Sequence, residues 1–359
     1  MKSAFIICLT IFLSTGFLQA KEIVPQVKEE IELMSALARL AEYEEFRPDT
    51  GGSYTDDIDS YLKKYRLHEA VKMMKDFRNT HKIEADDVMT LALQFECHGD
   101  HIVKLNTENK CSIPLNGKEI ATFLDALNDF YRQSDFREFF DQHSDVYANG
   151  ILSFYNSVIS HIDPSWYSRF YGTYPSKDLH IIIGFASGGN YYRATRARQG
   201  RPEEIFSIMY YAVDNNGQPF YDKSTVGTIT EELCLSFIDI DNNDVKTALA
   251  EASENVYRYT KEKPVAAVTD ENIMEESLAY ASTIYYLIDN GSSKKSIRKA
   301  VEEGVERGFS WTPELIKRIY YYTENRKEFP TFTSFYPEII EFFKDYAANL
   351  GKTILKVLK

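Results

Sequence analysis

Apolar residues recur at helical spacing along most of this chain. Between residues 27 and 46, the residues Ile31, Met34, Leu37 and Leu40 repeat every three or four positions, which predicts an amphipathic helix. Similar patterns predict further helices in the first half, at 56–65, 67–79, 85–95, 118–132 and 136–162. Asp163-Pro164 ends this half, because a proline disfavours helical geometry in the residue before it. We therefore expect residues 21–172 to form a helical region.

The pattern changes in the middle of the chain. Leu179–Phe185 is a short apolar run, and Ile205–Val213 is a second one that leads into the turn sequence Asp214-Asn-Asn-Gly217. Both runs predict strands. Helical patterns then return at 225–237, 244–260, 272–288, 295–307, 313–323 and 336–350. The predicted fold class is therefore α+β and mostly helical, with a small sheet and long helices within residues 173–359 that pack as one unit with the helical region.

The first twenty residues have the composition of an export signal. Lys2 supplies a positive charge, Ala4–Leu13 is an apolar core, and Ala20 offers a small residue at the cleavage position. We expect residues 1–20 to be removed and the mature protein to be exported, either to the periplasm or out of the cell. No other segment has the run of about eighteen apolar residues that a membrane-spanning helix needs.

Charge and cysteine content limit the possible partners and compartments. The formal net charge is -13 at pH 7, whereas nucleic-acid binding needs a basic surface, so we expect no nucleic-acid partner. All cysteines except Cys8 lie beyond residue 20. Cys97 and Cys111 are close enough in sequence to pair in an oxidising compartment, although the pairing stays open. Cys234 is expected to be a buried free cysteine.

Two short motifs resemble metal sites but have a simpler interpretation. His98-Gly-Asp-His101 follows Cys97 in a predicted polar loop between helices and has no clear complementary set of ligands apart from Cys111. Asp239-Ile-Asp-Asn-Asn-Asp244 resembles a calcium loop, but Asp244 and Ala250 stand where that pattern requires glycine and glutamate. We expect a surface loop at the first motif and a helix exit followed by an N-cap at the second.

The helix predicted at 225–237 carries the most informative acidic residues. Its core-facing stripe consists of Val226, Ile229, Leu233 and Phe237. Glu231 and Leu235 lie one turn apart on another face, and Glu232 follows Glu231. From the local sequence alone, Glu231 and Glu232 form an ordinary exposed pair near a helix N-terminus, where the helix dipole favours negative charge.

The wider sequence resembles a known family. The segments that carry the resemblance keep their order over nearly the whole mature chain: Glu32–Ala41, Tyr54–Tyr61, His68–Val71, Gly188–Tyr191, Asp214–Pro219, Thr230–Phe237, Gly308–Leu315 and Phe335–Ile340. They resemble a bacterial domain-of-unknown-function family of secreted proteins whose members look like zinc metallopeptidases of the zincin class, of the gluzincin type. Such peptidases hold zinc with the two histidines of a His-Glu-x-x-His helix and a downstream glutamate, and they use the helix glutamate as general base.

The resemblance implies a role for each position, and the chain departs from it at both histidines. Glu231 falls on the first zinc-binding histidine, Glu232 on the general base, Leu235 on the second histidine, and Glu276 on the downstream carboxylate ligand. Leucine cannot bind a metal, and the pair of Glu231 and Glu276 would suit Ca²⁺, Mg²⁺ or Mn²⁺ better than Zn²⁺. We therefore expect no bound cofactor and a zincin-like region, at 173–359, that is catalytically inactive.

Such a scaffold can still bind a peptide or protein in its cleft. Strand 179–185 would line this cleft, and Gly188, Gly189 and Asn190 at its edge would let a peptide approach the backbone closely, unless they form a simple strand-ending turn. Two catalytic alternatives stay open: a peptidase with non-standard ligands, or a hydrolase with a carboxylate-based site for hard-cation or glycoside chemistry. The hydrolase requires Glu232 and Glu276 to face a shared open cavity. A binding module unrelated to peptidases is the third alternative, and it would be favoured by the lack of a sheet-edge strand beside helix 225–237.

Overall fold

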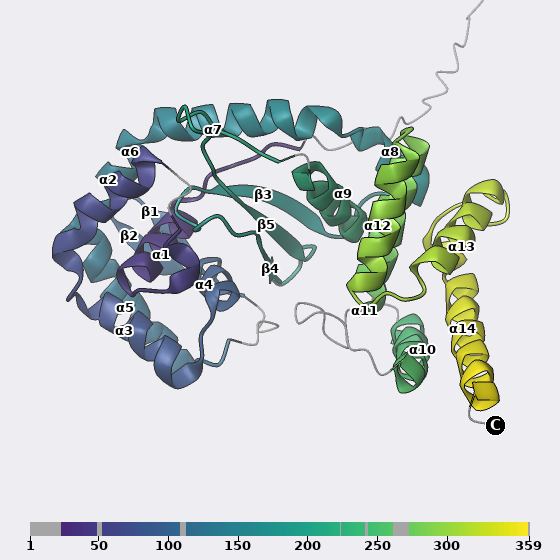
Figure 1. Cartoon of the computed structure of the whole chain (residues 1–359). Coiled ribbons are helices and arrows are strands. Elements are labelled where there is room, and N and C mark those ends of the chain that lie inside the picture. The colour runs from purple at the N-terminus through teal and green to yellow at the C-terminus, as the bar shows by residue number, and fades with distance from the viewer. Residues whose placement is uncertain are drawn as a thin grey trace, which may run out of the picture.

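A three-stranded sheet lies between two groups of helices (Figure 1). The computed structural model describes residues 23–48, 52–107, 113–222, 224–240, 243–260 and 273–357. α7 (Ser144–Ser157) runs along one side of the sheet, from the first group of helices to the second. This arrangement confirms the predicted α+β, mostly helical fold class. The predicted export signal at 1–20 lies outside the described residues.

The first group of helices surrounds α1 (Glu29–Leu40), which is buried on nearly all sides. The others are α2 (Ser53–Leu62), α3 (Glu69–Asp76), α4 (Ala85–Ala92), α5 (Gly117–Ser134) and α6 (Phe136–Gln142). The start of α5 is fixed by a capping box, in which Asn116 accepts from the Glu119 backbone N–H and Glu119 accepts from the Asn116 backbone N–H. Local sequence therefore sets where this helix begins.

A small hairpin follows α4, where a longer helix and a polar loop are predicted. β1 (Phe95–His98) pairs with β2 (His101–Lys104) in antiparallel register. Gly99 adopts a φ of 60°, which permits the tight turn between the strands. The predictions of a helix that reaches Phe95 and of a loop between helices at 98–101 are therefore wrong. The two strands are too short to show a periodic pattern, and the turn at Gly99 brings them together. Cys111, the predicted partner of Cys97, lies outside the described residues.

The central sheet has the strand order β3-β5-β4. β3 (Asp178–Gly184) and β5 (Glu204–Tyr210) are parallel, and β4 (Tyr192–Arg196) is antiparallel to β5. The strands predicted at 179–185 and 205–213 are found here, and a turn with a bridge from Val213 to Pro219 follows the second. β4 was not predicted, because its buried positions include Arg196, which breaks the apolar alternation and is neutralised by Glu204 on β5.

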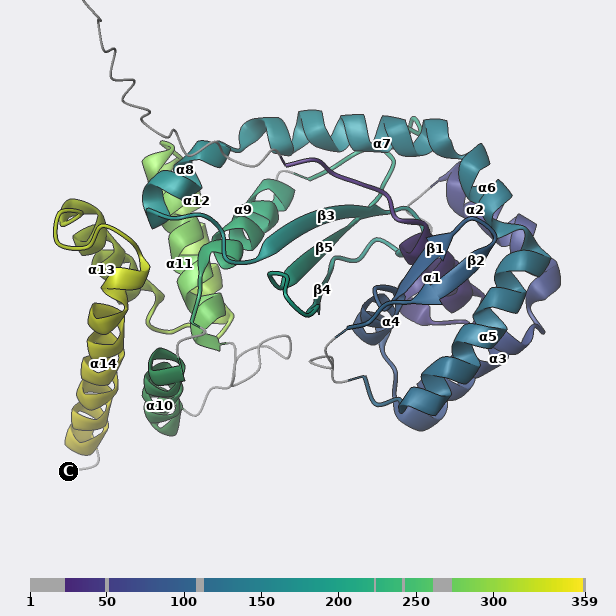
Figure 2. The same cartoon turned by 180° about the vertical axis from the view of Figure 1, so that it is seen from behind.

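The second group of helices covers the other end of the sheet. It comprises α8 (Pro164–Tyr171), α9 (Ser224–Phe237), α10 (Asn243–Thr260), α11 (Ile273–Asp289), α12 (Lys294–Glu306), α13 (Thr312–Glu324) and α14 (Tyr336–Val357). α9 lies between the sheet and α11 in both views (Figures 1 and 2). Every helix predicted from the second half of the sequence is present. In the described part of the chain, no helix has the length and apolar character needed to cross a membrane.

Contacts join the predicted helical region to the region beyond residue 172. The Gln26 backbone N–H donates to Ile181 at 2.9 Å, and the Ile183 N–H donates back to Gln26 at 2.8 Å, which seats the N-terminal segment on the edge of β3. Within α8, Trp166 packs edge-on against Tyr286 of α11. α8 therefore packs with the C-terminal group of helices.

Glu32 of α1 fixes the end of β3 from the interior of the protein. Its fully buried carboxylate accepts hydrogen bonds from the backbone N–H groups of Phe185 at 2.7 Å and Ala186 at 3.2 Å, and from the Tyr54 hydroxyl at 2.8 Å. Burial raises the pKa of this carboxyl from 4.5 to about 7, although the three hydrogen bonds oppose the change.

Stability should therefore depend on pH through Glu32. Because the folded pKa lies above the unfolded value of 4.5, the contribution of this group is complete below pH 4.5 and is lost as the pH rises to about 7. The loss is at most about 1.4 kcal/mol per pH unit. We expect Glu32→Gln to flatten the slope of unfolding free energy against pH in urea titrations between pH 4.5 and 7.5, and the exposed Glu44→Gln to leave it unchanged. Parallel slopes for Glu32→Gln and the wild type would contradict this account.

Candidate functional site

α9 is buried far more completely than an amphipathic surface helix. Besides its predicted apolar stripe, the side chains of Thr230, Glu232, Cys234, Leu235 and Ser236 are buried. Glu232 is only 1% exposed. The interpretation of Glu231 and Glu232 as an ordinary exposed pair is therefore wrong for Glu232, because the sheet and α11 enclose this helix from both sides.

The carboxylate of Glu232 is held by Tyr191, which precedes β4, and by Arg193 of β4. The Tyr191 hydroxyl donates to Oε1 at 2.5 Å. The Arg193 Nε donates to Oε1 at 2.9 Å and Oε2 at 3.0 Å, and its Nη2 donates to Oε1 at 2.5 Å. Both carboxylate oxygens therefore accept charge-assisted hydrogen bonds from a guanidinium, which is the strong form of this interaction.

The same guanidinium also binds Glu276 of α11. Arg193 Nη1 donates to Glu276 Oε1, and Glu276 is 3% exposed. Burial raises the pKa of Glu276, Arg193 opposes this shift, and the neighbouring charges of Glu231 and Glu232 add to it. Burial alone would lower the pKa of Arg193, but the two carboxylates and Tyr191 raise it well above its ordinary value. Arg193 is thus a permanent cation between two buried carboxylates.

Glu231 is bound separately by an arginine from the end of α12. Arg307 Nη2 donates to Oε1 at 2.7 Å, and Nη1 donates to Oε2 at 3.0 Å, so the pair is bidentate. The guanidinium of Arg307 also lies 4.4 Å from the centre of the Tyr280 ring, within cation–π range. The structure therefore places the three predicted glutamates near one another, with two arginines among them.

Leu235 contributes only an apolar surface to this region. Its side chain is 4% exposed, and Cys234 beside it is completely buried. Burial raises the pKa of the Cys234 thiol to about 12, so this cysteine is a neutral apolar residue rather than a thiolate ligand. No group of three histidine, cysteine, aspartate or glutamate side chains suited to a metal occurs within the described ranges.

The chain matches a family model described as a domain of unknown function, DUF4932, over residues 23–342. It belongs to this family. No curated protein and no solved structure matches it. The DUF4932 assignment confirms the predicted domain-of-unknown-function family, and its description names no activity.

In this DUF4932 protein, the predicted peptide-binding residues 188–190 approach another part of the chain. Gly188 has a φ of 72°, and a side chain there would meet the backbone oxygen of Glu45 at 2.1 Å. The Asn190 Nδ2 donates to the same oxygen at 2.8 Å. Gly189 also has a positive φ, of 81°. These residues pack the turn after β3 against residues 44–46, and their role at a cleft edge stays a prediction.

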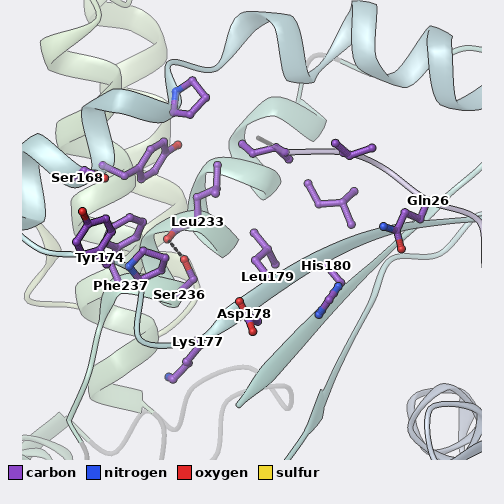
Figure 3. A pocket seen from close by; sticks show the side chains of 16 residues that line it. Gln26, Ser168, Tyr174, Lys177, Asp178, Leu179, His180, Leu233, Ser236 and Phe237 are labelled. Atoms are coloured by element: carbon purple, nitrogen blue, oxygen red, sulfur yellow. Dashed lines mark hydrogen bonds between the residues drawn. The ribbon is translucent and has the colours of Figure 1, made fainter. Parts of the chain in front are cut away.

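A separate cavity of about 490 Å³ lies beside α9 and β3 (Figure 3). Leu233, Ser236 and Phe237 of α9 and the first half of β3 contribute to its wall. Strand β3, which was expected to line the cleft of the acidic residues, therefore lines this separate cavity. The strand that contacts Glu232 is β4 instead.

The roles of Tyr191, Arg193 and Arg307 were not predicted from the sequence. Arg193 lies 39 positions from Glu232 and 83 from Glu276, so no local spacing relates them. The available signal was chemical: a buried helix that carries adjacent glutamates must be supplied with cations from elsewhere. The sequence Tyr191-Tyr-Arg193, directly after the glycine-rich turn, supplies one of these cations.

Removing the guanidinium should destabilise the protein strongly at neutral pH. We expect Arg193→Met to lower the free energy of unfolding by about 3–5 kcal/mol, because it leaves two buried carboxylates without their shared partner. The penalty should shrink as the pH falls and the Glu276 carboxyl, whose pKa is raised by burial, becomes protonated. Urea unfolding at pH 5 and pH 7 measures both effects.

Arg198→Met is the matched control. Its side chain is as exposed as that of Arg193, at 24%, and its partner Glu204 keeps a second arginine, Arg196. Equal losses in the free energy of unfolding for the two variants would show that the Arg193 bridge stabilises the protein no more than the Arg198 ion pair does.

Proposed function

We propose that this is an exported relative of zinc metallopeptidases that has lost its zinc site and acts as a non-catalytic protein that binds a peptide or protein. The observation that carries the proposal is the position of Arg193. Its guanidinium lies between Glu232 and Glu276, the two residues that the resemblance assigns to the general base and the third zinc ligand. An organic cation thus neutralises carboxylates that a metal ion would otherwise neutralise.

The residues present do not fit a catalytic zinc ion. Such an ion needs three protein ligands with N, S or O donors and one open position. Leu235 has no donor atom, and both oxygens of Glu231 accept from Arg307. Glu276 accepts from Arg193. Each candidate ligand is therefore either chemically unable to bind zinc or already engaged with an arginine.

Glu232 is also poorly suited to act as a general base. A base must accept a proton from a water molecule or substrate within hydrogen-bonding reach. Both Glu232 oxygens are occupied by Arg193, Oε1 also accepts from Tyr191, and the residue is almost completely buried.

The same geometry weighs against the catalytic alternatives. A glycosidase-like or hard-cation hydrolase needs Glu232 and Glu276 to converge on open space, whereas they converge on Arg193. A peptidase with non-standard ligands would need the oxygens that the two arginines occupy. The unrelated binding module is disfavoured because β4, a strand at the sheet edge, contacts α9 through Arg193 and Glu232.

Elemental analysis combined with a protease assay tests the proposal. The purified protein, incubated with zinc and then freed of excess metal, should hold far less than one zinc per chain and should not cleave denatured casein. Glu232→Gln should change neither result. Stoichiometric zinc together with proteolysis that Glu232→Gln abolishes would overturn the proposal.

Restoring the histidines gives the same test a second arm. Glu231→His with Leu235→His should still bind little zinc, because Arg193 keeps Glu276 engaged. Adding Arg193→Met should increase zinc binding if Arg193 stands in place of the metal. Equal zinc content with and without Arg193→Met would argue against that substitution of one cation for another.

A further inference from the structure

The outer edge of β3 presents backbone groups without partners among the described residues. Alternate residues of β3 bond to β5, as the Asp178 N–H does with Glu203. Leu179, Ile181 and Ile183 face the other way, as the bonds of Ile181 and Ile183 with Gln26 show. Gln26 uses the Ile181 carbonyl and the Ile183 N–H, and no described residue bonds to the Ile181 N–H or to the Leu179 N–H and carbonyl. Such groups are obligatory hydrogen-bonding groups.

The apolar cavity of about 490 Å³ lies directly beside this edge (Figure 3). Leu233 and Phe237 of α9 and Tyr167 of α8 contribute to its wall, and Ile23 and Val24 border it on the side of the N-terminal segment. Val24 and Tyr174 are large apolar side chains that also line the cavity, yet they are 53% and 62% exposed. Its volume lies within the range of about 300–1,000 Å³ that is typical of ligand sites.

Gln26 already shows how a chain segment seats on this edge. The Gln26 N–H donates to the Ile181 carbonyl, and the Gln26 carbonyl accepts from the Ile183 N–H, two positions further along β3. The Leu179 carbonyl and the Ile181 N–H form an equivalent pair one step earlier on the strand. The corresponding residue of the N-terminal segment is Val24, which makes neither bond. Among the described residues, no backbone therefore occupies the place next to Gln26 on β3.

We propose that this edge binds an extended peptide segment of a partner protein, with alternating apolar side chains. The peptide backbone pairs with Leu179 and Ile181, and its apolar side chains on the α9 side enter the cavity between Leu233 and Phe237. Strand addition of this kind takes affinity from backbone hydrogen bonds and selectivity from pockets for alternate side chains.

The chemistry of the site favours a peptide over a compact apolar molecule. A lipid chain or small hydrocarbon would fill the cavity but leave the Ile181 N–H and the Leu179 carbonyl unpaired, at a cost in free energy for each buried group. An extended backbone alone supplies a donor and an acceptor at strand spacing. The charges near the cavity are paired, as Lys177 is with Glu275 at 3.3 Å, so they do not call for a charged ligand.

This inference rests on the proposed binding function for its meaning, but it concerns a different face of α9. The zinc and protease measurements test whether the Glu232 site is inactive. Peptide binding at β3 tests a separate surface. The proposal of an inactive Glu232 site and the proposal of a peptide site at β3 can therefore be contradicted independently.

The experiment uses the chain from Lys21 onward and a seven-residue, acetylated and amidated peptide in which valine and phenylalanine alternate with threonine. Isothermal titration calorimetry should detect binding. A peptide with N-methyl groups on its central backbone nitrogens should bind at least about tenfold more weakly, as should a peptide with serine in place of the apolar residues. Hydrogen exchange of the Ile181 amide should slow when the first peptide is added.

Two protein variants locate the site. Leu179→Asp places a carboxylate at the cavity wall and should weaken binding by at least about tenfold. Leu152→Asp makes the same change at an exposed position of α7, 58% exposed and away from the cavity, and should leave binding unchanged. Thermal unfolding of both variants shows that they are folded. Absence of binding to the wild type, equal binding to the two variants, or an Ile181 amide that is already protected without peptide because Val24 closes onto the edge, would each overturn the proposal.

Discussion

The guanidinium of Arg193, which lies between two buried carboxylates, is the constraint on which the arrangement around α9 depends. Two carboxylates from different helices, Glu232 and Glu276, could not both stay charged in the interior without a cation between them. Arg193 supplies that cation from β4 and so ties one strand to two helices. A buried ion pair of this kind is weak evidence for stability in itself, but breaking it from one side is expensive. A change at any one of Arg193, Glu232 and Glu276 therefore affects the other two.

Side chains of α9 meet two different chemical environments. One face presents Glu232 to β4 and is closed by the arginine. Leu233 and Phe237 lie instead near the start of β3, where an apolar cavity adjoins backbone groups that have no partner among the described residues. The position of β3 depends in turn on the first helical group, through Glu32 at its end and Gln26 at its edge.

Much of the fold follows from the sequence, because its helices have strong periodic patterns and its caps are local. The start of α5 and the strands β3 and β5 are examples. β4 could not be found in this way, since the buried position at Arg196 looks polar until Glu204 is known to lie opposite it. The hairpin at 95–104 was not predicted for a different reason: its strands are too short to show an alternation of apolar and polar residues.

The candidate site shows the same limit. Glu231, Glu232 and Glu276 could be selected from the family resemblance, and Leu235 could be recognised as a residue without a donor atom. Their partners could not be selected, because Arg193 and Arg307 reach them only through the tertiary fold. Gly188 was predicted to let a peptide approach the backbone closely, and in the structure the Glu45 backbone lies against it.

A double-mutant cycle tests the central claim most directly. Urea unfolding at pH 7 would compare the wild type with Arg193→Met, Glu276→Gln and the combined variant. If the guanidinium neutralises Glu276, the second change should cost much less once the first has been made, with a coupling energy above about 1 kcal/mol. Costs that add to within about 0.5 kcal/mol would contradict the account, because they would show that Arg193 and Glu276 are close without depending on each other.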